Sequence, residues 1–112
     1  MGSYNEHQIL VTQIMVELSK NPNVRVWANN TGVAESLDSY RVVRYGLVGS
    51  ADITGIIGPN GTRLEIEVKT GKGKQTLNQK NFEQMIKKLG GVYIVARSVL
   101  DATEGIRNAD GS

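Results

Sequence analysis

The sequence contains no cysteine and a single histidine, His7. Without cysteine the chain forms no disulfide, builds no thiolate zinc site and has no cysteine nucleophile. One histidine excludes metal sites made of several histidines and argues against a Ser-His-Asp triad.

Long hydrophobic runs are absent too. No apolar run approaches the roughly 20 residues of a membrane-spanning helix. The first residues lack the charged-then-apolar pattern of a secretion signal, so we expect a cytoplasmic protein that has no membrane partner. At 112 residues the chain is long enough for one core and too short for two, which predicts a single domain over 1–112.

The charges are distributed unevenly, although the net charge is only +2. The segment 69–88 carries six lysines and one acid, Glu83, and so has a local charge of +5. A positive patch beside clustered carboxylates suits a polyanionic substrate that approaches a metal site. The alternative is a solvated helix face preceded by a flexible Gly-Lys loop.

Hydrophobic periodicity and turn residues divide the chain into expected helices and strands. Helices are expected at 5–20, 76–89 and 98–107, and strands at 24–28, 40–45, 51–57, 63–69 and 92–96. Residues 33–39 are interpreted as a polar loop and Trp27 as a core residue. The order α-β-β-β-β-α-β-α predicts an α/β or α+β protein with one mixed β-sheet flanked by helices. In it, an antiparallel meander leads through a helical crossover to a parallel last strand.

One expected strand carries charges at every second position. Glu65, Glu67 and Lys69 therefore project from one face of that strand. Burying two carboxylates and an ammonium beside a third carboxylate, Asp52, costs free energy unless something compensates. A divalent metal ion is the natural compensation.

The turn at 58–61 decides whether Asp52 joins this face. A two-residue loop puts Asp52 opposite Glu67, and a four-residue loop puts it opposite Lys69. Either register brings the carboxylates within about 5–8 Å, close enough to share one ion. A three-residue loop with a bulge at Gly61 would separate them.

These residue types suit phosphodiester hydrolysis. The reaction brings hydroxide to a phosphorus shielded by negative oxygens and then stabilises the charge that develops. Mg²⁺ held by one or two carboxylates, with positions left for water and phosphate, meets this need. A lysine beside the ion can hold or deprotonate the attacking water. Asp52, Glu67 and Lys69 are therefore candidate catalytic residues.

Asp52 followed by Glu67-Val68-Lys69 on the next strand resembles the PD-(D/E)xK signature of restriction-endonuclease-like nucleases. The proline that usually precedes the Asp is absent. More of the chain, roughly residues 5–98, is similar to one branch, the virus-type replication-repair nuclease (VRR-NUC) domain. The matching features are Glu6 on the first helix, Gly49-Ser50-Ala51-Asp52, Glu67-Val68-Lys69, Gln79 at the start of the next helix, and Gly90-Gly91 before the last strand.

The resemblance implies a restriction-endonuclease-like core and a role for each matched residue. Asp52, Glu67 and the backbone carbonyl of Val68 would hold Mg²⁺ or Mn²⁺, and Lys69 would position the nucleophilic water. Gln79 would orient phosphate or water. Glu6 would lie at the edge of the site and act through water or through Lys69. Candidate nucleic-acid contacts are Ser50, Lys72, Lys74 and Lys80.

Simpler interpretations exist for several of these residues. Glu67 and Lys69 can form a surface ion pair, and Asp52 can cap a turn. Glu65 can be a further ligand or a solvated outer residue, of which we favour the second. Glu6 fits a capping box with Ser3. His7 is interpreted as a helix-face residue.

The resemblance further implies a metal-dependent, structure-specific DNA endonuclease, similar to Holliday-junction resolvases and acting as a homodimer on four-way junctions. It suggests a bacterial or phage origin; a phage-encoded protein would act in the cytoplasm of the host. The alternatives are a restriction-like or nicking nuclease of the same fold and a non-catalytic nucleic-acid-binding module. The segment 71–74 lacks the Gly-Lys-Ser/Thr ending of a Walker motif, so NTP binding is not expected.

Overall fold

A computed structural model of the chain describes residues 5–29, 32–35, 42–45 and 49–109. The start of the expected second strand, Tyr40 and Arg41, lies outside them. The elements are α1 (Glu6–Leu18), β1 (Val24–Ala28), β2 (Gly32–Glu35), β3 (Val42–Tyr45), β4 (Ile53–Ile57), β5 (Thr62–Val68), α2 (Leu77–Lys88), β6 (Val92–Ala96) and α3 (Val99–Ala109).

Four strands form the central sheet, in the order β1-β4-β5-β6. β4 runs antiparallel to both β1 and β5, and β6 is parallel to β5. The chain is thus an α/β protein with one mixed four-stranded sheet flanked by helices, as the sequence predicts. The parallel pairing of β5 and β6 follows from the helix between them, because a crossover through α2 returns the chain in the same direction.

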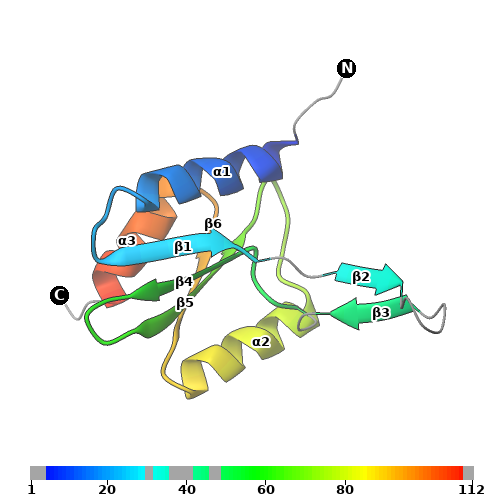
Figure 1. The fold of residues 1–112 in the computed structure, drawn as a ribbon. Coiled ribbons are helices and arrows are strands. Elements are labelled where there is room, and N and C mark those ends of the chain that lie inside the picture. The colour runs from blue at the N-terminus through cyan, green and yellow to red at the C-terminus, as the bar shows by residue number, and fades with distance from the viewer. Residues whose placement is uncertain (1–4, 30–31, 36–41, 46–48, 110–112) are drawn as a thin grey trace.

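The expected meander is wrong in one respect. β2 and β3 pair with each other in a separate two-stranded sheet, and β2 occupies part of the segment predicted to be a loop. The element order is therefore α-β-β-β-β-β-α-β-α. A strand as short as β2 is stabilised by pairing with β3 rather than by its own residues. The hydrophobic periodicity of the sequence therefore did not predict it. Figure 1 shows β2 and β3 projecting from the end of the sheet where β1 ends and β4 begins.

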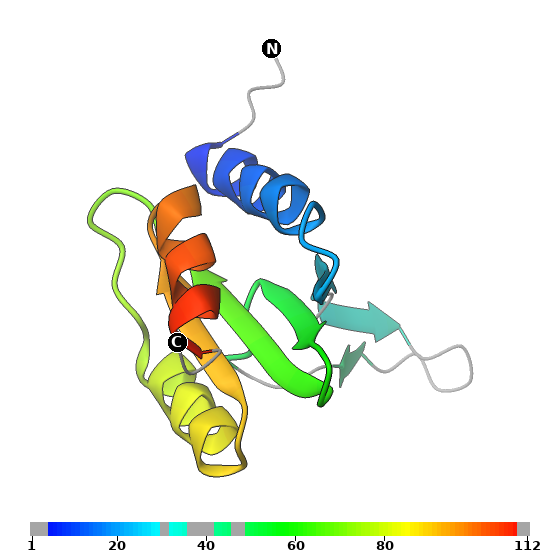
Figure 2. The same cartoon turned by 90° about the vertical axis from the view of Figure 1, so that its left-hand side faces the viewer.

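One face of the sheet is covered by α1 and α3 and is apolar throughout (Figures 1 and 2). α1 contributes Val11, Ile14 and Leu18, and α3 contributes Ala102 and Ile106. They pack on the inward residues of the strands, Val24, Ile53, Ile57, Leu64, Ile66, Val68, Ile94 and Ala96. This layer is the main core, and its strand residues alternate with the polar residues of the other face.

The opposite face is covered only in part. α2 packs on its β6 side through Phe82 and Ile86, which meet Ala51 and Tyr93 in a smaller cluster. Leu77 and Leu89 do not join this cluster and are 73% and 77% exposed. Both lie at the ends of the helix, where the chain turns away from the sheet.

Trp27 also departs from its interpretation as a core residue. It lies on β1, an edge strand of the sheet, and is 48% exposed. Within the described part of the chain, no helix is long and apolar enough to cross a membrane.

Candidate active site

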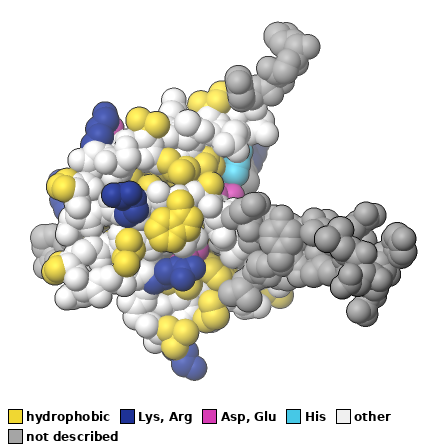
Figure 3. Space-filling model, viewed as in Figure 1, with side chains coloured by type: hydrophobic (Ala, Val, Ile, Leu, Met, Phe, Trp, Pro, Cys, Tyr) yellow, Lys and Arg dark blue, Asp and Glu magenta, His cyan; other side chains and the backbone are white. Residues whose placement is uncertain are grey.

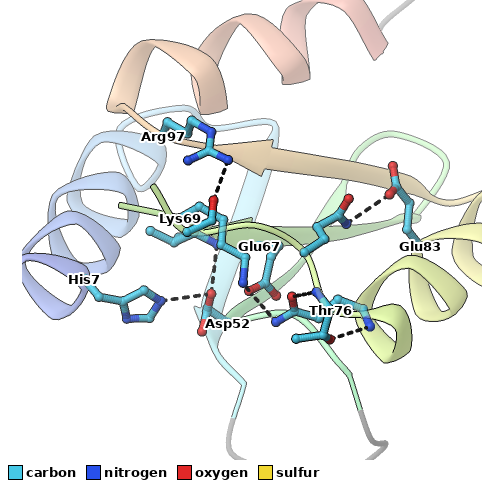
Figure 4. Close-up of polar contacts among 11 residues, drawn as sticks. His7, Asp52, Glu67, Lys69, Thr76, Glu83 and Arg97 are labelled. Atoms are coloured by element: carbon cyan, nitrogen blue, oxygen red, sulfur yellow. Dashed lines mark hydrogen bonds and ion pairs between the residues drawn. The ribbon is translucent and has the colours of Figure 1, made fainter. Parts of the chain in front are cut away.

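The register of the β4–β5 hairpin brings the predicted carboxylates together. Ile53 faces Ile66 and Ile57 faces Thr62, which is the register of the two-residue-loop alternative. Continued by one residue, it places Asp52 opposite Glu67. Asp52 and Glu67 lie where β4 begins and β5 ends, and Figure 4 shows them pointing toward one another.

Asp52 directly precedes the first residue of β4, at the point where the backbone hydrogen bonds between β4 and β5 end. Its Oδ2 accepts a hydrogen bond from the backbone N–H of Val68 at 2.8 Å, so the carboxylate replaces a main-chain acceptor. The backbone C=O of Asp52 accepts from Asn29, which ties the same residue to the end of β1. Asp52 is therefore held from both neighbouring strands, with its side chain at the end of the sheet.

Glu67 is buried, with 3% of its surface exposed. Its Oε2 lies 3.3 Å from Lys69 Nζ and accepts from Gln79 Nε2 at 2.8 Å. Its Oε1 is buried and has no hydrogen-bond partner among the described residues. Burial, and then the charge of Asp52, raise the pKa of Glu67 to about 7, although Lys69 opposes the shift. A cation bound beside Glu67 would oppose this shift and favour its ionised form.

Gln79 reaches Glu67 because of the way α2 begins. Thr76 is the N-cap of α2, and its hydroxyl accepts from Gln79 N while Gln79 Oε1 accepts from Thr76 N. This capping box fixes the Gln79 amide and directs its NH₂ group at Glu67. The side chain predicted to orient phosphate or water thus holds the carboxylate of Glu67 in place.

The first turn of α1 reaches the site through His7 and not through Glu6. His7 Nε2 lies 3.3 Å from Asp52 Oδ2 (Figure 4). Glu6 is the first residue of α1 and is exposed, and the structure shows no bond between it and Asp52, Glu67 or Lys69. The N-cap of α1 is Asn5, which accepts from Gln8, in place of the capping box considered with Ser3, a residue outside the described ranges.

The sequence interpretation of His7 as a plain helix-face residue missed this contact. The available signal was position, because His7 directly follows the residue that the resemblance singled out. The role predicted for Glu6 stays a prediction.

The Gly-Lys loop passes over the site between β5 and α2. Its lysines Lys72 and Lys74, and Lys80 on α2, are exposed. Arg97, which sequence reasoning did not single out, donates to the carbonyls of Gly71 and Gly73 at 3.4 and 2.7 Å. Parallel β5 and β6 end at the same edge, so the residue after β6 lies near the loop that leaves β5.

The Gly49-Ser50 segment packs against the start of α2. Gly49 has a φ of +82°, and a Cβ there would collide with the backbone carbonyl of Asn78. Glycine is required because no side chain fits between this segment and the helix. Ser50 is half-buried beside the site, and its predicted contact with nucleic acid is an open expectation.

Glu65 is neither a solvated outer residue nor close to Asp52. It is fully buried, accepts from Arg63 Nε at 2.6 Å, and receives a 3.3 Å hydrogen bond from Thr54. The solvated interpretation is therefore wrong. Register explains the difference, because Glu65 faces Thr54 on β4 whereas Glu67 faces Asp52.

The donor set fits a divalent cation of the Mg²⁺ type. No group of three or more His, Asp or Glu side chains among the described residues is arranged to hold a metal ion. Mg²⁺ commonly takes only one or two carboxylates and completes its coordination with water and substrate phosphate. Asp52 and Glu67 supply two such carboxylates, and Glu67 Oε1 is an unpartnered buried oxygen. The chemistry of these groups matches the predicted Mg²⁺ or Mn²⁺.

Comparison with known proteins does not assign the chain to a family. No protein-family model matches the chain, and no curated protein matches it. The resemblance to VRR-NUC domains therefore stays a prediction from the motifs.

Proposed function

We propose that this protein is a Mg²⁺- or Mn²⁺-dependent DNA nuclease that hydrolyses phosphodiesters at Asp52, Glu67 and Lys69. One observation carries the proposal. Glu67 is buried, has a pKa of about 7 and lies beside Asp52, with one oxygen that lacks a partner. Such a pair is costly in a structural role and useful in a metal-assisted reaction.

The side chains of the site have two kinds of role, metal binding and positioning. Asp52 and Glu67 would hold the cation, together with the carbonyl of Val68, whose own N–H already donates to Asp52. The bound metal would lower the pKa of a water and offset charge on the phosphate. Gln79 and His7 are positioning residues, since each holds one carboxylate by a single hydrogen bond.

Lys69 is the residue that meets the reacting atoms. Its side chain is 14% exposed, and its ammonium lies 3.3 Å from Glu67 Oε2. From there it donates to the oxygen of the attacking water or to a non-bridging phosphate oxygen. The water gives up a proton to solvent as its oxygen bonds to phosphorus, the ester P–O bond breaks, and the leaving oxygen takes a proton from solvent.

The finer parts of the proposal rest on the sequence resemblance. They are a restriction-endonuclease-like fold, cleavage of four-way junctions and action as a homodimer. Two symmetric cuts require two sites, which a dimer of one small chain supplies. Lys72, Lys74 and Lys80 are exposed cations beside the site and would contact phosphates.

A cleavage panel tests the activity and its specificity together. Labelled four-way junction, flap and plain duplex are incubated with Mg²⁺ or Mn²⁺ and the wild-type chain, Asp52→Asn or Lys69→Ala. We expect divalent-dependent cutting that each substitution lowers by about 10³-fold. Equal cutting of all three substrates would remove the resolvase assignment in favour of a restriction-like or nicking nuclease. If Lys69→Ala kept full activity, the cleavage would come from a contaminant. The remaining alternative would then be a non-catalytic nucleic-acid-binding module.

A further inference from the structure

Three cross-strand rows of side chains share the face of the sheet that α2 leaves partly open. Arg25 faces Ile56, which faces Arg63. In the next row Trp27 faces Thr54, which faces Glu65. The row after that holds the Asp52–Glu67 pair. The hydrogen bond from Thr54 to Glu65 confirms that the middle row lies on one face.

The exposed part of these rows is aromatic and cationic. Trp27 is 48% and Ile56 is 42% exposed. Arg25 and Arg63 are exposed, whereas on this face Glu65 and Glu67 are buried and Asp52 is half-buried. The Arg63–Glu65 pair orders the guanidinium of Arg63. No described residue forms an ion pair with Arg25, and solvent therefore meets a tryptophan with two arginines beside it.

Figure 3 shows this arrangement on the surface. Hydrophobic side chains gather over β1 and the neighbouring strands, with Lys or Arg side chains close by. The histidine and an acidic side chain lie further along the same visible face. The patch and the candidate active site are therefore open to the same partner.

The spacing matches a short length of nucleic acid. Neighbouring strands lie about 4.8 Å apart and alternate residues advance about 6.6 Å, which puts the Cα of Trp27 roughly 8 Å from that of Asp52. The hydrogen bond from Asn29 N to the Asp52 carbonyl shows that the strands still run side by side there. Stacked nucleotides advance about 3.4 Å each and unstacked ones advance further, so Trp27 lies about one or two nucleotides from a phosphate at the carboxylates.

We propose that Trp27, with Arg25 and Arg63, is a stacking platform for an unpaired base one or two nucleotides from the scissile phosphate. This inference rests on the proposed nuclease function and narrows its substrate to DNA with unpaired nucleotides beside the cut. Bases stack on tryptophan through their π-faces, and arginines hold the adjoining phosphates. A base inside a duplex presents no free face to an indole. A second copy of this chain fits less well, because a two-fold contact would set the arginines of one patch against those of the other.

The tryptophan supplies its own signal, since it is the only one in the chain. Fluorescence is recorded in EDTA, where no cleavage occurs, during titration with a short oligothymidine. An abasic strand of equal length and a blunt duplex of equal length are the comparisons. We expect oligothymidine to quench the emission strongly, and the abasic strand and duplex to quench it weakly. Equal quenching by the oligothymidine and the abasic strand would overturn the platform, because only phosphate contact would remain.

Variants separate stacking from charge. By anisotropy of a labelled oligothymidine, Trp27→Ala should raise Kd about tenfold and Trp27→Phe by less, with the abasic affinity unchanged. Arg25→Ala should weaken both strands alike and reduce the slope of log K against log salt by about 1. The matched control is Leu100→Ala on α3, which is 62% exposed and should change nothing. A change in sedimentation of Trp27→Ala with no change in Kd would identify a self-association surface instead.

Failure of the platform and failure of the nuclease are distinguishable. If Trp27 stacks on bases in EDTA but the protein cleaves nothing in Mg²⁺ or Mn²⁺, the stacking platform is supported and the nuclease function is rejected. If Trp27→Ala cleaves a flap with the KM of the wild type, the nuclease function is supported and the stacking platform is rejected.

Discussion

Strand β5 is buried on both faces, and the two faces have opposite chemistry. Leu64, Ile66 and Val68 have no exposed surface and pack under α1 and α3. Between them, Glu65 and Glu67 are 0% and 3% exposed. Burial of the first set is a large source of stability, whereas burial of a carboxylate opposes folding unless it is satisfied. Equal burial therefore does not mean an equal contribution to folding.

The two glutamates differ from each other as well. Glu65 is satisfied by Arg63 and by Thr54. Glu67 shares one oxygen between Lys69 and Gln79, and its other oxygen has no partner in the described part of the chain. A carboxylate with complete bonding is a structural group, and an incompletely bonded one beside a second carboxylate has the character of a binding site.

The largest expected effect is on the apolar face. Ile66→Ala should lower the free energy of unfolding by about 3–4 kcal/mol, because it leaves a cavity under α1 and α3. Ile56→Ala, the same change on the neighbouring strand at a 42% exposed position, should cost less than about 1 kcal/mol. Urea denaturation of both variants measures the difference. Similar losses would show that the faces of the sheet do not differ as described.

Glu67 gives the next largest effect, and it depends on pH. Its pKa rises from an ordinary 4.5 to about 7 on folding, so the folded chain binds more protons than the unfolded chain between these values. Stability should fall as pH rises through this window, by up to about 3 kcal/mol, and level off above pH 7. Glu67→Gln should match the wild type near pH 5 and exceed it near pH 8 in metal-free buffer.

Divalent ions sharpen this test. Mg²⁺ or Mn²⁺ should raise the melting temperature of the wild type at pH 8 and leave that of Glu67→Gln almost unchanged. Glu65→Gln is the matched control, which should be destabilised at pH 8 because it weakens the pair with Arg63. A wild-type stability that is flat between pH 5 and pH 8 would contradict the account of Glu67.

The smallest effect concerns the partner of Glu65. Arg63→Ala should cost about 1–2 kcal/mol more than Arg25→Ala, because it leaves a buried carboxylate without its cation. The expected loss of stability is small because the Arg63 side chain is 58% exposed, so water screens its pair with Glu65. Thermal melts of both variants at pH 7 and low salt give the comparison, and equal losses would reject a structural role for the Arg63–Glu65 pair.

Much of the site was predictable because its residues lie on elements with clear patterns. Alternation placed Glu67 and Lys69 on a strand, and β4 and β5 follow the expected positions closely. The hydrogen bond from Gln79 to Glu67 agrees with the predicted place of Gln79 in the site. The position of Trp27 was not predictable, because its hydrophobicity is the same on an edge strand as in a core.

The sequence by itself determined the helices and strands of the main sheet and the cluster of charges on β5, because periodicity and side-chain chemistry are local properties. Only the tertiary structure decided which acids come together at the candidate site. The register of the 58–61 turn set Asp52 opposite Glu67 and Thr54 opposite Glu65. Packing of α1 then brought His7 to Asp52. Such contacts depend on distances between residues far apart in the chain, which a local pattern does not contain.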